Sequence, residues 1–592
     1  MPVWSILSLI IKNNMKVSDY IISYIESRGV HVIFGYIGGM ITHLVDSVSQ
    51  NPNMQFIQTY HEQTAAIAAE GFAKESGLFG VAISTSGPGA TNMMAGIADA
   101  YFDSIPVLYI TGQVNTYEYK YDKPVRQQGF QETDIVSMVK SVTKYAKLID
   151  KAEDIKYELD KALYIALSGR KGPVLLDLPM DIQREEINPE TLIGYSGESI
   201  LNNPLIAWEE IRLLMESSHR PMLLLGAGCC NSDMVLLNDF IRRHHFPVIT
   251  SLMGRGAIDE TYDNYIGMIG SYGNRCANMG VANADLLIAL GTRLDTRQTG
   301  ARLDQFLSNG HIIHVDIDDN ELEYHRLLNR KKVNCTIDCF LQKEKEMPIS
   351  LGDISEWNFF LHGLKQRYGQ DAEIERFVEN KSPYRFMQYF DSLTQTDDVI
   401  CADIGQNQMW AAQTLRLKSG QKFVTSGGLA PMGFSLPVAI GCSFANPNKK
   451  VFSINGDGGF HMAIQSLMLI SQYNLPIKVI ILNNASLGMI TQFQHLYFDD
   501  RMCGTTLNGG YRVPDLKSLS TAYGLPYFRL TVDRLDDPDL REEMQAAHNC
   551  IIECVVEGLT SVSPKLEYDK PISKPLPLLP EEEYKENMLS EV

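Results

Sequence analysis

Three stretches of the chain alternate short apolar runs, rich in β-branched residues, with amphipathic helical patterns. This alternation limits the fold more than any other feature, because parallel strands must be joined by crossover connections that are usually helical. The 592 residues are about four times the ~150 residues of a typical domain, so several buried cores are expected. The sequence therefore predicts an α/β protein with three doubly wound parallel-sheet domains.

Shifts in pattern and composition predict five segments. In chain order they are an N-terminal extension (1–14), a first sheet domain (15–190), a central domain (204–345), a third sheet domain (380–563) and a Pro-rich, acidic tail (564–592). A polar linker is expected over 185–203, and the charged segment 331–346 is expected to lead toward the third domain. The tail cannot build a core of its own, so it either lies over the body or is mobile.

Strands are expected where the apolar runs are short and bounded by turn residues. These runs are 30–34, 55–59, 80–85, 106–111 and 175–179 in the first domain, 221–225, 246–250, 284–290 and 311–317 in the second, and 399–402, 450–455, 477–482 and 551–556 in the third.

The acidic composition argues against several classes of partner. With 52 Lys+Arg against 71 Asp+Glu, a net charge of −19 and no long Lys/Arg run, the chain would repel nucleic acid and anionic lipid. Residues 4–11 are apolar but lack the basic residue and cleavage site of a signal peptide, and no apolar run reaches the ~20 residues of a membrane span. Neither nucleic acid nor membrane is predicted as a partner.

The ten cysteines indicate the compartment. They begin at Cys229 and include no C-x-x-C pair. This pattern predicts buried thiols in a reducing cytoplasm rather than a disulfide framework or a zinc site. A cytoplasmic protein is therefore expected.

A candidate metal site follows two neighbouring strands of the third domain. Asp457 lies in a Gly-Asp-Gly-Gly run directly after one strand, and Asn484 follows the next strand along the chain. Because the carboxyl ends of parallel strands meet at one sheet edge, these oxygen ligands should lie close together, with the Ser486 carbonyl as a third. Mg²⁺ prefers such ligands when it also binds a phosphate. A Gly-Asp-Gly run alone also fits an N-capped strand-to-helix turn, but with Asn-Asn behind it the pattern resembles the thiamine diphosphate motif.

With further motifs, the chain resembles the catalytic subunits of acetohydroxyacid (acetolactate) synthases over almost its whole length. The motifs are residues 59–63 (TYHEQ), 84–92 (STSGPGATN), 130–132 (FQE), 405–413 (GQNQMWAAQ) and 426–429 (SGGL). The resemblance implies a pyrimidine-binding domain, a central domain and a diphosphate-binding domain. It also implies a homodimer or homotetramer, with each active site between the first domain of one subunit and the third domain of another.

The resemblance assigns roles to individual residues. Glu62 would hydrogen-bond the aminopyrimidine of the cofactor and promote removal of the thiazolium C2 proton, a task for a carboxyl group in a buried cleft. Met432 would support the bent cofactor, although a core methionine is also compatible with its position. Gln131 and Phe130 are further expected at the catalytic centre. The other cofactor contacts would be Pro88, Asn92, Gln406, Asn407, Gly456, Gly458, Gly459, Gly488 and Met489.

The central domain carries a candidate nucleotide site. Gly226 and Gly228 follow a strand, but a lone G-x-G equally fits a tight turn, and a nicotinamide-dependent oxidoreductase would need glycine where Asn231 stands. Segment 291–300 resembles the flavin site of the same family, and Asp316 at a strand end could bind a ribose hydroxyl. The expected contacts are Ser251, Leu252, Tyr272, Gly273, Arg293, Asp295, Asp316 and Ile317. FAD is expected there, in a structural role, with ADP or no ligand as alternatives.

Departures from the family leave the acceptor open. Arg297 aligns with the arginine that holds the carboxylate of a second keto acid, which suits a bidentate guanidinium. The family's lysine and tryptophan are replaced by Met180 and Phe493, and a Tyr-Pro-Gly-Gly loop becomes residues 36–39 (YIGG).

The leading hypothesis is a carboligase that decarboxylates pyruvate and transfers the two-carbon acyl unit to a second keto substrate. Alternatives are a keto sugar nucleotide as acceptor or a 2-keto acid decarboxylase. A non-catalytic partner protein would tolerate loss of Glu62 or Asp457, yet both are present.

Overall fold

In a computed structural model the protein is described over residues 14–197, 207–308 and 310–589. The predicted N-terminal extension lies, except for residue 14, outside the described residues. The described chain forms three six-stranded sheets in which every adjacent pair of strands is parallel, plus a short antiparallel pair, β1 (Met15–Lys16) with β8 (Glu186–Ile187). The predicted fold class is confirmed.

The first sheet has the strand order β3-β2-β4-β5-β7-β6. Its strands are β2 (Val32–Tyr36), β3 (Gln55–Gln58), β4 (Gly80–Ser84), β5 (Val107–Gln113), β6 (Tyr145–Leu148) and β7 (Val174–Pro179). Its helices are α2 (Val17–Ser27), α3 (Thr42–Gln50), α4 (Glu62–Ser76), α5 (Pro88–Asn92), α6 (Met94–Phe102), α7 (Ile135–Val139), α8 (Ile155–Leu167) and α9 (Met180–Arg184).

The central sheet has the order β11-β10-β9-β12-β13-β14. Its strands are β9 (Pro221–Leu225), β10 (Val248–Thr250), β11 (Tyr265–Met268), β12 (Leu286–Leu290), β13 (His311–Asp316) and β14 (Arg330–Asn334). Its helices are α10 (Trp208–Glu216), α11 (Met234–Arg243), α12 (Arg275–Asn283), α13 (Thr296–Thr299), α14 (Asp319–Glu323) and α15 (Ile337–Glu346), followed by α16 (Ser355–Tyr368) and α17 (Gln370–Phe377).

The third sheet has the order β16-β15-β17-β18-β20-β19. Its strands are β15 (Val399–Ala402), β16 (Lys422–Val424), β17 (Val451–Gly456), β18 (Ile477–Asn483), β19 (Tyr527–Leu530) and β20 (Cys550–Val555). Its helices are α18 (Ser382–Leu393), α19 (Gln406–Thr414), α20 (Ser435–Ala445), α21 (Asp457–Met462), α22 (Leu467–Gln472), α23 (Gly488–Tyr497), α24 (Leu516–Ala522) and α25 (Pro538–Ala546).

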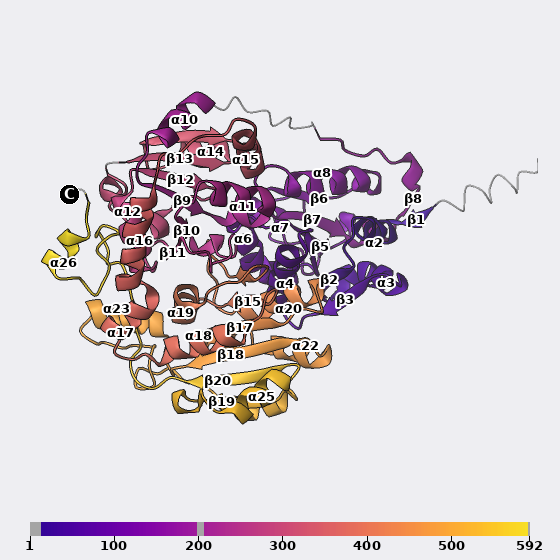
Figure 1. The fold of residues 1–592 in the computed structure, drawn as a ribbon. Helices are drawn as coiled ribbons and strands as arrows, with labels where there is room; N and C mark the ends of the chain where they lie inside the picture. The colour runs from indigo at the N-terminus through magenta and orange to yellow at the C-terminus, as the bar shows by residue number, and fades with distance from the viewer. Residues whose placement is uncertain (1–13, 198–206, 309, 590–592) are drawn as a thin grey trace, which may run out of the picture.

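The first and third domains of the chain are joined by a close crossing of α4 and α20 (Figure 1). A Cβ at Gly71 would lie 2.2 Å from the carbonyl oxygen of Val438, and one at Gly441 only 1.9 Å from that of Ala68. Glycine is therefore required on both helices, because any side chain would separate the two backbones. This crossing packs α4, which begins at Glu62, against the third domain of its own chain.

The described part of the acidic tail, residues 564–589, lies over the body, which settles for these residues the alternative left by the sequence. Lys565 pairs with Leu576 as an isolated bridge, and the Leu566 N–H donates to the Ser271 carbonyl at 2.7 Å. Ile572 is buried in the core cluster of the central domain, and α26 (Glu581–Glu586) ends the described tail. A Pro-rich segment without a core of its own is thus ordered by an existing surface.

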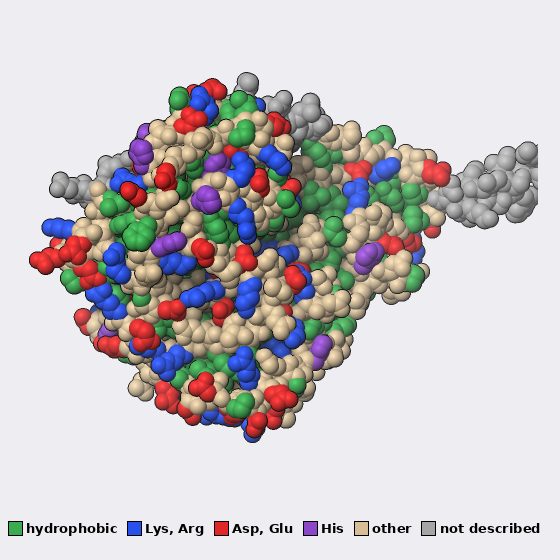
Figure 2. All heavy atoms as spheres, viewed as in Figure 1, with side chains coloured by type: hydrophobic (Ala, Val, Ile, Leu, Met, Phe, Trp, Pro, Cys, Tyr) green, Lys and Arg blue, Asp and Glu red, His purple; other side chains and the backbone are tan. Residues whose placement is uncertain are grey.

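Three further observations concern the charged surface, the thiols and the length of the apolar helices. Figure 2 shows acidic and basic side chains interspersed over the face in view. All ten cysteines are free thiols, and Cys230 and Cys503 are the exposed ones. Within the described ranges, none of the helices combines the length and apolarity needed to cross a bilayer.

A buried ion pair holds the tail and gives a stability prediction. The Arg275 guanidinium bonds the Glu373 carboxylate at 2.8 and 2.9 Å, with side chains 1% and 0% exposed, and it also donates to the Pro575 carbonyl at 3.1 Å. We expect Arg275→Met to destabilise the fold by about 3–5 kcal/mol, because Glu373 is left charged and buried. Thermal unfolding checks this, with Arg302→Met, whose pairing with Asp304 is solvent-exposed, as a control that should cost about 1 kcal/mol or less.

Candidate active site

The two predicted metal ligands of the third domain lie at one edge of its sheet. β17 and β18 are adjacent and parallel, with Gly456 opposite Leu482. Asp457 begins the helix after β17, and Asn484 directly follows β18. Short strand-to-helix connections place both side chains at the carboxyl ends of the strands, where open α/β sheets bind ligands.

Asp457 has an unpartnered oxygen. The residue is 2% exposed; its Oδ1 accepts a hydrogen bond from the Tyr511 hydroxyl at 3.0 Å, whereas Oδ2 has no partner among the described residues. Burial raises the pKa of Asp457 to about 6. A buried carboxylate oxygen without a donor indicates that a cation or another donor belongs there. Tyr511 was not predicted, because it lies outside every motif of the sequence.

Asn484 is oriented by a residue that the sequence analysis also missed. Its amide nitrogen donates to the Thr560 hydroxyl at 3.0 Å, and its Oδ1 accepts from the Ser486 N–H at 3.2 Å. The Thr560 hydroxyl in turn donates to Oε1 of Gln406 at 2.6 Å. Because an amide oxygen has two lone pairs, Oδ1 of Asn484 retains acceptor capacity.

Glycines allow the backbone to approach this edge closely. A Cβ at Gly459 would lie 2.4 Å from Oδ1 of Asp403, and a Cβ at Gly488 would lie 2.0 Å from Oε1 of Gln406. Asn407 beside them has a buried Oδ1 without a partner among the described residues. The region thus combines N–H groups at helix starts, which favour anions, with two unsatisfied polar side chains.

Met432 lies beside the same edge. A Cβ at Gly458 would lie 3.1 Å from the Tyr511 hydroxyl and 3.4 Å from Cε of Met432. The buried Asp403 carboxylate holds the Met432 loop from its own domain by accepting from the N–H groups of Gly433 and Ser435 at 3.1 and 3.0 Å. The apolar side chain is therefore placed next to the glycines that would face a diphosphate.

One large cavity is lined by residues of all three domains, including Lys74 and Asp103 of the first domain. It has a volume of about 1240 Å³ and is lined by the predicted metal and diphosphate residues. It is also lined by most residues that were predicted for the flavin site, namely Gly228, Ser251, Leu252, Tyr272, Arg293, Asp295, Asp316 and Ile317. Gly226 and Gly273 do not line it; a Cβ at Gly226 would lie 2.2 Å from the Gly291 carbonyl oxygen, so close packing explains this glycine.

Two central-domain carboxylates have defined surroundings. Asp316 ends β13, and burial raises its pKa to about 6. Asp295 caps α13 by accepting from the N–H groups of Arg297 and Gln298, and it pairs with Arg293 at 3.2 Å. Asp295 thus forms an ion pair with an arginine, whereas Asp316 forms none among the described residues.

Arg297 lines the cavity beside a contact between the central and third domains. Its guanidinium carbon lies 5.9 Å from the centre of the Tyr272 ring, whose hydroxyl donates to Sδ of Met489 at 3.3 Å. Within the described part of the chain its guanidinium has no carboxylate within 4.0 Å. Arg297 is thus a cation without a counterion in a cavity that also contains the predicted diphosphate residues. Phe493 and Met180 do not line this cavity.

Glu62 and its neighbours form a separate group in the first domain. Glu62 is 7% exposed and accepts from the Asn92 amide at 3.0 Å, and a Cβ at Gly89 would lie 3.2 Å from its Oε1. Gln131, with φ of +63°, lies against Gly87, and Phe130 is 79% exposed. Pro88 begins α5 in the same motif. None of these predicted residues lines the large cavity.

Comparison with known proteins agrees with this division into three domains. Residues 15–138 match the N-terminal TPP binding domain of thiamine pyrophosphate enzymes, 209–338 match their central domain, and 403–556 match their C-terminal TPP binding domain. The chain is 36% identical over 543 residues to acetolactate synthase 2, chloroplastic, of Brassica napus, covering 89% of this chain and 83% of that protein. The chain belongs to the acetolactate synthase family of thiamine pyrophosphate enzymes.

Relatives from other kingdoms agree. A probable acetolactate synthase large subunit of Methanocaldococcus jannaschii is 36% identical over 561 residues, 90% of each chain. The acetolactate synthase isozyme 2 large subunit of Escherichia coli is 34% identical over 515 residues, 86% of this chain and 90% of the relative. The resemblance predicted from the motifs is therefore confirmed, and this chain is a thiamine pyrophosphate-dependent enzyme of that family.

The residues present fit this cofactor. The unpartnered Asp457 Oδ2, together with the glycines at the strand ends, fits a metal-bound diphosphate. The pyrimidine half of the predicted set, around Glu62, lies outside this cavity. A single chain of this synthase-family enzyme thus presents the two halves of the predicted site in two places.

Proposed function

We propose that this chain is a magnesium-dependent carboligase that decarboxylates pyruvate and transfers the two-carbon acyl unit to a second keto substrate. The observation that carries the proposal is the buried Asp457 carboxylate, with one unpartnered oxygen, in the same cavity as the uncompensated Arg297. The first group suits a bridging cation and the second suits a carboxylate substrate. Family membership supports the same reaction type.

In this proposal the third domain holds the metal and the diphosphate. Asp457, Asn484 and the Ser486 carbonyl would bind Mg²⁺, and N–H groups near Gly458, Gly459 and Gly488 would bind the diphosphate. When bound, thiamine diphosphate supplies the nucleophilic carbon and the electron sink of the reaction. Met432 would support the cofactor with its apolar side chain, and Gln406 would be held in place by Thr560.

Glu62 would act across a subunit interface. Asn92 holds its carboxylate, and Phe130 of the same group of predicted residues is 79% exposed, so this aromatic side chain would be available for contact with a second copy of the chain. We propose a homodimer, or a homotetramer built from it, in which Glu62 of one copy serves the cavity of the other. Glu62 would then hold or pass a proton at the aminopyrimidine nitrogen.

FAD is proposed for the central part of the cavity. Asp316 lies at a strand end, has no ion pair with an arginine among the described residues, and would accept a hydrogen bond from a ribose hydroxyl. The role of FAD would be structural, because the net carboligation is not a redox reaction. Absorbance of the purified protein in the visible range, with release of the chromophore on denaturation, tests this assignment.

The function is tested by product analysis. Purified protein is incubated with pyruvate, thiamine diphosphate and Mg²⁺, and acetolactate and free acetaldehyde are measured. The proposal expects acetolactate as the main product. Acetaldehyde alone would indicate a decarboxylase, and absence of both products would contradict pyruvate as the donor.

Arg297→Lys tests the acceptor clamp. Lysine keeps the positive charge but loses the planar guanidinium fork, so the carboxylate of the acceptor is held less rigidly. We expect carboligation to fall more than decarboxylation, by about 10-fold in the ratio of acetolactate to acetaldehyde. A wild-type ratio that is high and survives the substitution would count against this role. Arg302→Lys, whose guanidinium pairs with Asp304 at the surface and does not line the cavity, is the matched control.

A further inference from the structure

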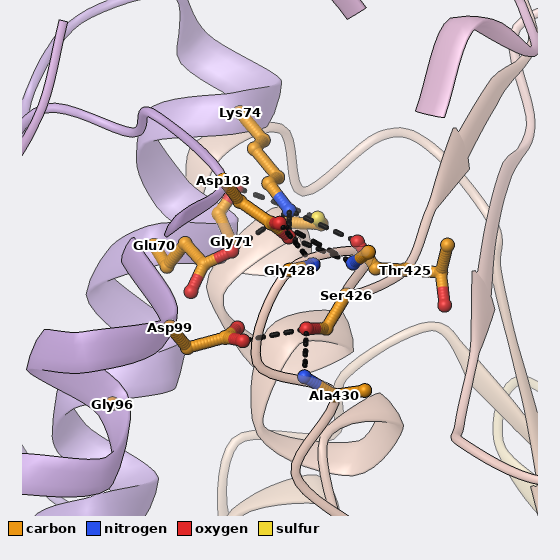
Figure 3. A network of polar contacts seen from close by, with 12 residues as sticks. Glu70, Gly71, Lys74, Gly96, Asp99, Asp103, Thr425, Ser426, Gly428 and Ala430 are labelled. Atoms are coloured by element: carbon orange, nitrogen blue, oxygen red, sulfur yellow. Dashed lines mark hydrogen bonds and ion pairs between the residues drawn. The ribbon is translucent and has the colours of Figure 1, made fainter. Parts of the chain in front are cut away.

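The segment that leads to Met432 is held by the first domain of the same chain. Residues 426–430 connect the end of β16 to the Met432 loop, and they lie against the ends of α4 and α6 (Figure 3). Acidic side chains of the first domain form hydrogen bonds with this segment of the third domain. None of these acidic residues belongs to the motifs that assign the cofactor site.

Asp103 and Asp99 bind this segment through its backbone and through one hydroxyl. The Gly428 N–H donates to Oδ1 of Asp103 at 2.9 Å, and the Gly427 N–H donates to Oδ2 at 3.2 Å. The Ser426 hydroxyl donates to Oδ1 of Asp99 at 2.5 Å and accepts from the Ala430 N–H at 2.9 Å. Ala430 has φ of +60°, which a non-glycine residue adopts only when its surroundings impose it.

Lys74 neutralises part of this acidic cluster. Carboxylate oxygens of Glu70, Asp99 and Asp103 lie within 4.8 Å of one another. The Lys74 ammonium is 2.7 Å from Glu70 and 3.7 Å from Asp103, and it donates to the Thr425 carbonyl at 3.2 Å. Burial raises the pKa of Glu70 and of Asp99. A lysine already occupies the position where a metal ion would be sought, so the cluster is a contact between the first and third domains of the chain and not a metal site.

Two features of α4 make this contact relevant to the reaction. Glu62 begins the helix, and Glu70 and Lys74 follow two and three turns later on the same rigid element. The glycine crossing of α4 with α20 brings the backbone of the helix into close contact with the third domain. The helix that carries the proposed proton-transfer glutamate supports this segment through Lys74, which donates to the Thr425 carbonyl and pairs with Asp103 directly after α6.

We propose that Asp99, Asp103 and Ser426 are positioning residues for the cofactor site, which act by fixing segment 426–430 and hence Met432. The proposal rests on the proposed function in one respect only: it takes Met432 to contact thiamine diphosphate. In a homodimer the first domain of one chain would then contribute to two active sites, because its Glu62 would serve one site and its Asp99 and Asp103 would support Met432 in the other.

Hydrogen exchange of the protein without cofactor tests the contact itself. Ser426→Ala removes the acceptor of the Ala430 N–H and the donor to Asp99. We expect the peptide that contains Ala430 to exchange about 5-fold faster, as for a lost hydrogen bond, whereas Ser426→Thr, which keeps the hydroxyl, should exchange as the wild type does. Glu75→Gln is the matched control, because Glu75 lies on the same helix and pairs with Lys422 and Lys449 without touching segment 426–430.

The consequence for the cofactor is measured on the bound complex. Deuterium exchange of the thiazolium C2 proton and kcat should both fall about 10- to 100-fold in Ser426→Ala, with cofactor affinity within about 3-fold of wild type and recovery in Ser426→Thr. Asp103→Asn, the milder change, serves if Ser426→Ala does not fold. Wild-type rates in both variants, or an equal loss in Glu75→Gln, would overturn the positioning role.

These readouts separate this inference from the proposed function. C2 exchange requires bound cofactor but neither pyruvate nor an acceptor. If the wild type binds thiamine diphosphate and exchanges the C2 proton but forms no acetolactate, the proposed reaction fails while the positioning role is still decided. If the wild type does not bind thiamine diphosphate, both are contradicted.

Discussion

Glu62→Gln is expected to slow turnover by about 10²- to 10⁴-fold, the usual contribution of a general acid–base group. Glutamine has the same shape and can still accept the hydrogen bond from Asn92, which lies 3.0 Å from the carboxylate. It cannot take up or deliver a proton at the aminopyrimidine nitrogen. Because the site is otherwise unchanged, folding and cofactor affinity should remain close to those of the wild type.

Steady-state kinetics with pyruvate, together with the affinity for thiamine diphosphate by calorimetry, checks this prediction. Glu75→Gln makes the same chemical change on the same helix, in a residue that pairs with Lys422 and Lys449. It should leave kcat near the wild-type value. Turnover of Glu62→Gln within about tenfold of wild type would remove Glu62 from the proton-transfer role, and equal losses in both variants would indicate a structural effect.

The central strands of the three sheets could be predicted from the sequence, whereas most edge strands could not. Pro221–Leu225 and Val399–Ala402 have the predicted bounds, because continuous apolar runs are typical of strands buried on both faces. The strands β6, β11, β14, β16 and β19 were missed. Each of these five lies at the end of its sheet, where only one side pairs with a neighbouring strand: β6 in the first sheet, β11 and β14 in the central sheet, and β16 and β19 in the third.

Segment 331–346 shows why the edges were missed. It was expected to lead toward the third domain, but it forms β14 and α15 of the central domain. β14 has the sequence RKKVN, in which Val333 is buried and the lysines are polar. Charged side chains suit an edge strand because they discourage pairing with another chain, and they also remove the apolar pattern on which sequence-based prediction depends.

The candidate site could be predicted to the extent that it follows strand ends. Asp457 and Asn484 follow adjacent parallel strands, so topology alone brings them together. Tyr511 and Thr560 could not be found in this way, because they come from loops that are far from either strand in sequence. The contact of Asp99 and Asp103 with segment 426–430 likewise depends on how two domains pack, which no local pattern encodes.

Asp457→Ala is expected to abolish magnesium-dependent retention of thiamine diphosphate. Without the carboxylate, the diphosphate would face Asn484 and backbone N–H groups with no firmly held cation between them. Loss of a buried charged partner costs about 3 kcal/mol or more, which corresponds to a decrease in affinity of about 100-fold or more. Binding of the cofactor and catalysis should fall together, and the residual affinity should no longer depend on the Mg²⁺ concentration.

Calorimetric titration with thiamine diphosphate at several Mg²⁺ concentrations measures this effect, and two comparisons make it specific. Tyr511→Phe removes the hydroxyl that donates to Oδ1 of Asp457 at 3.0 Å but leaves the carboxylate in place, so it should retain most of the affinity. The cofactor-free Asp457→Ala protein should be no less stable than wild type, because Oδ2 is buried without a partner among the described residues and removing such a group relieves a desolvation cost. A variant that unfolds at lower temperature without cofactor would indicate a structural role. Unchanged cofactor affinity in a stable Asp457→Ala protein would contradict the metal assignment.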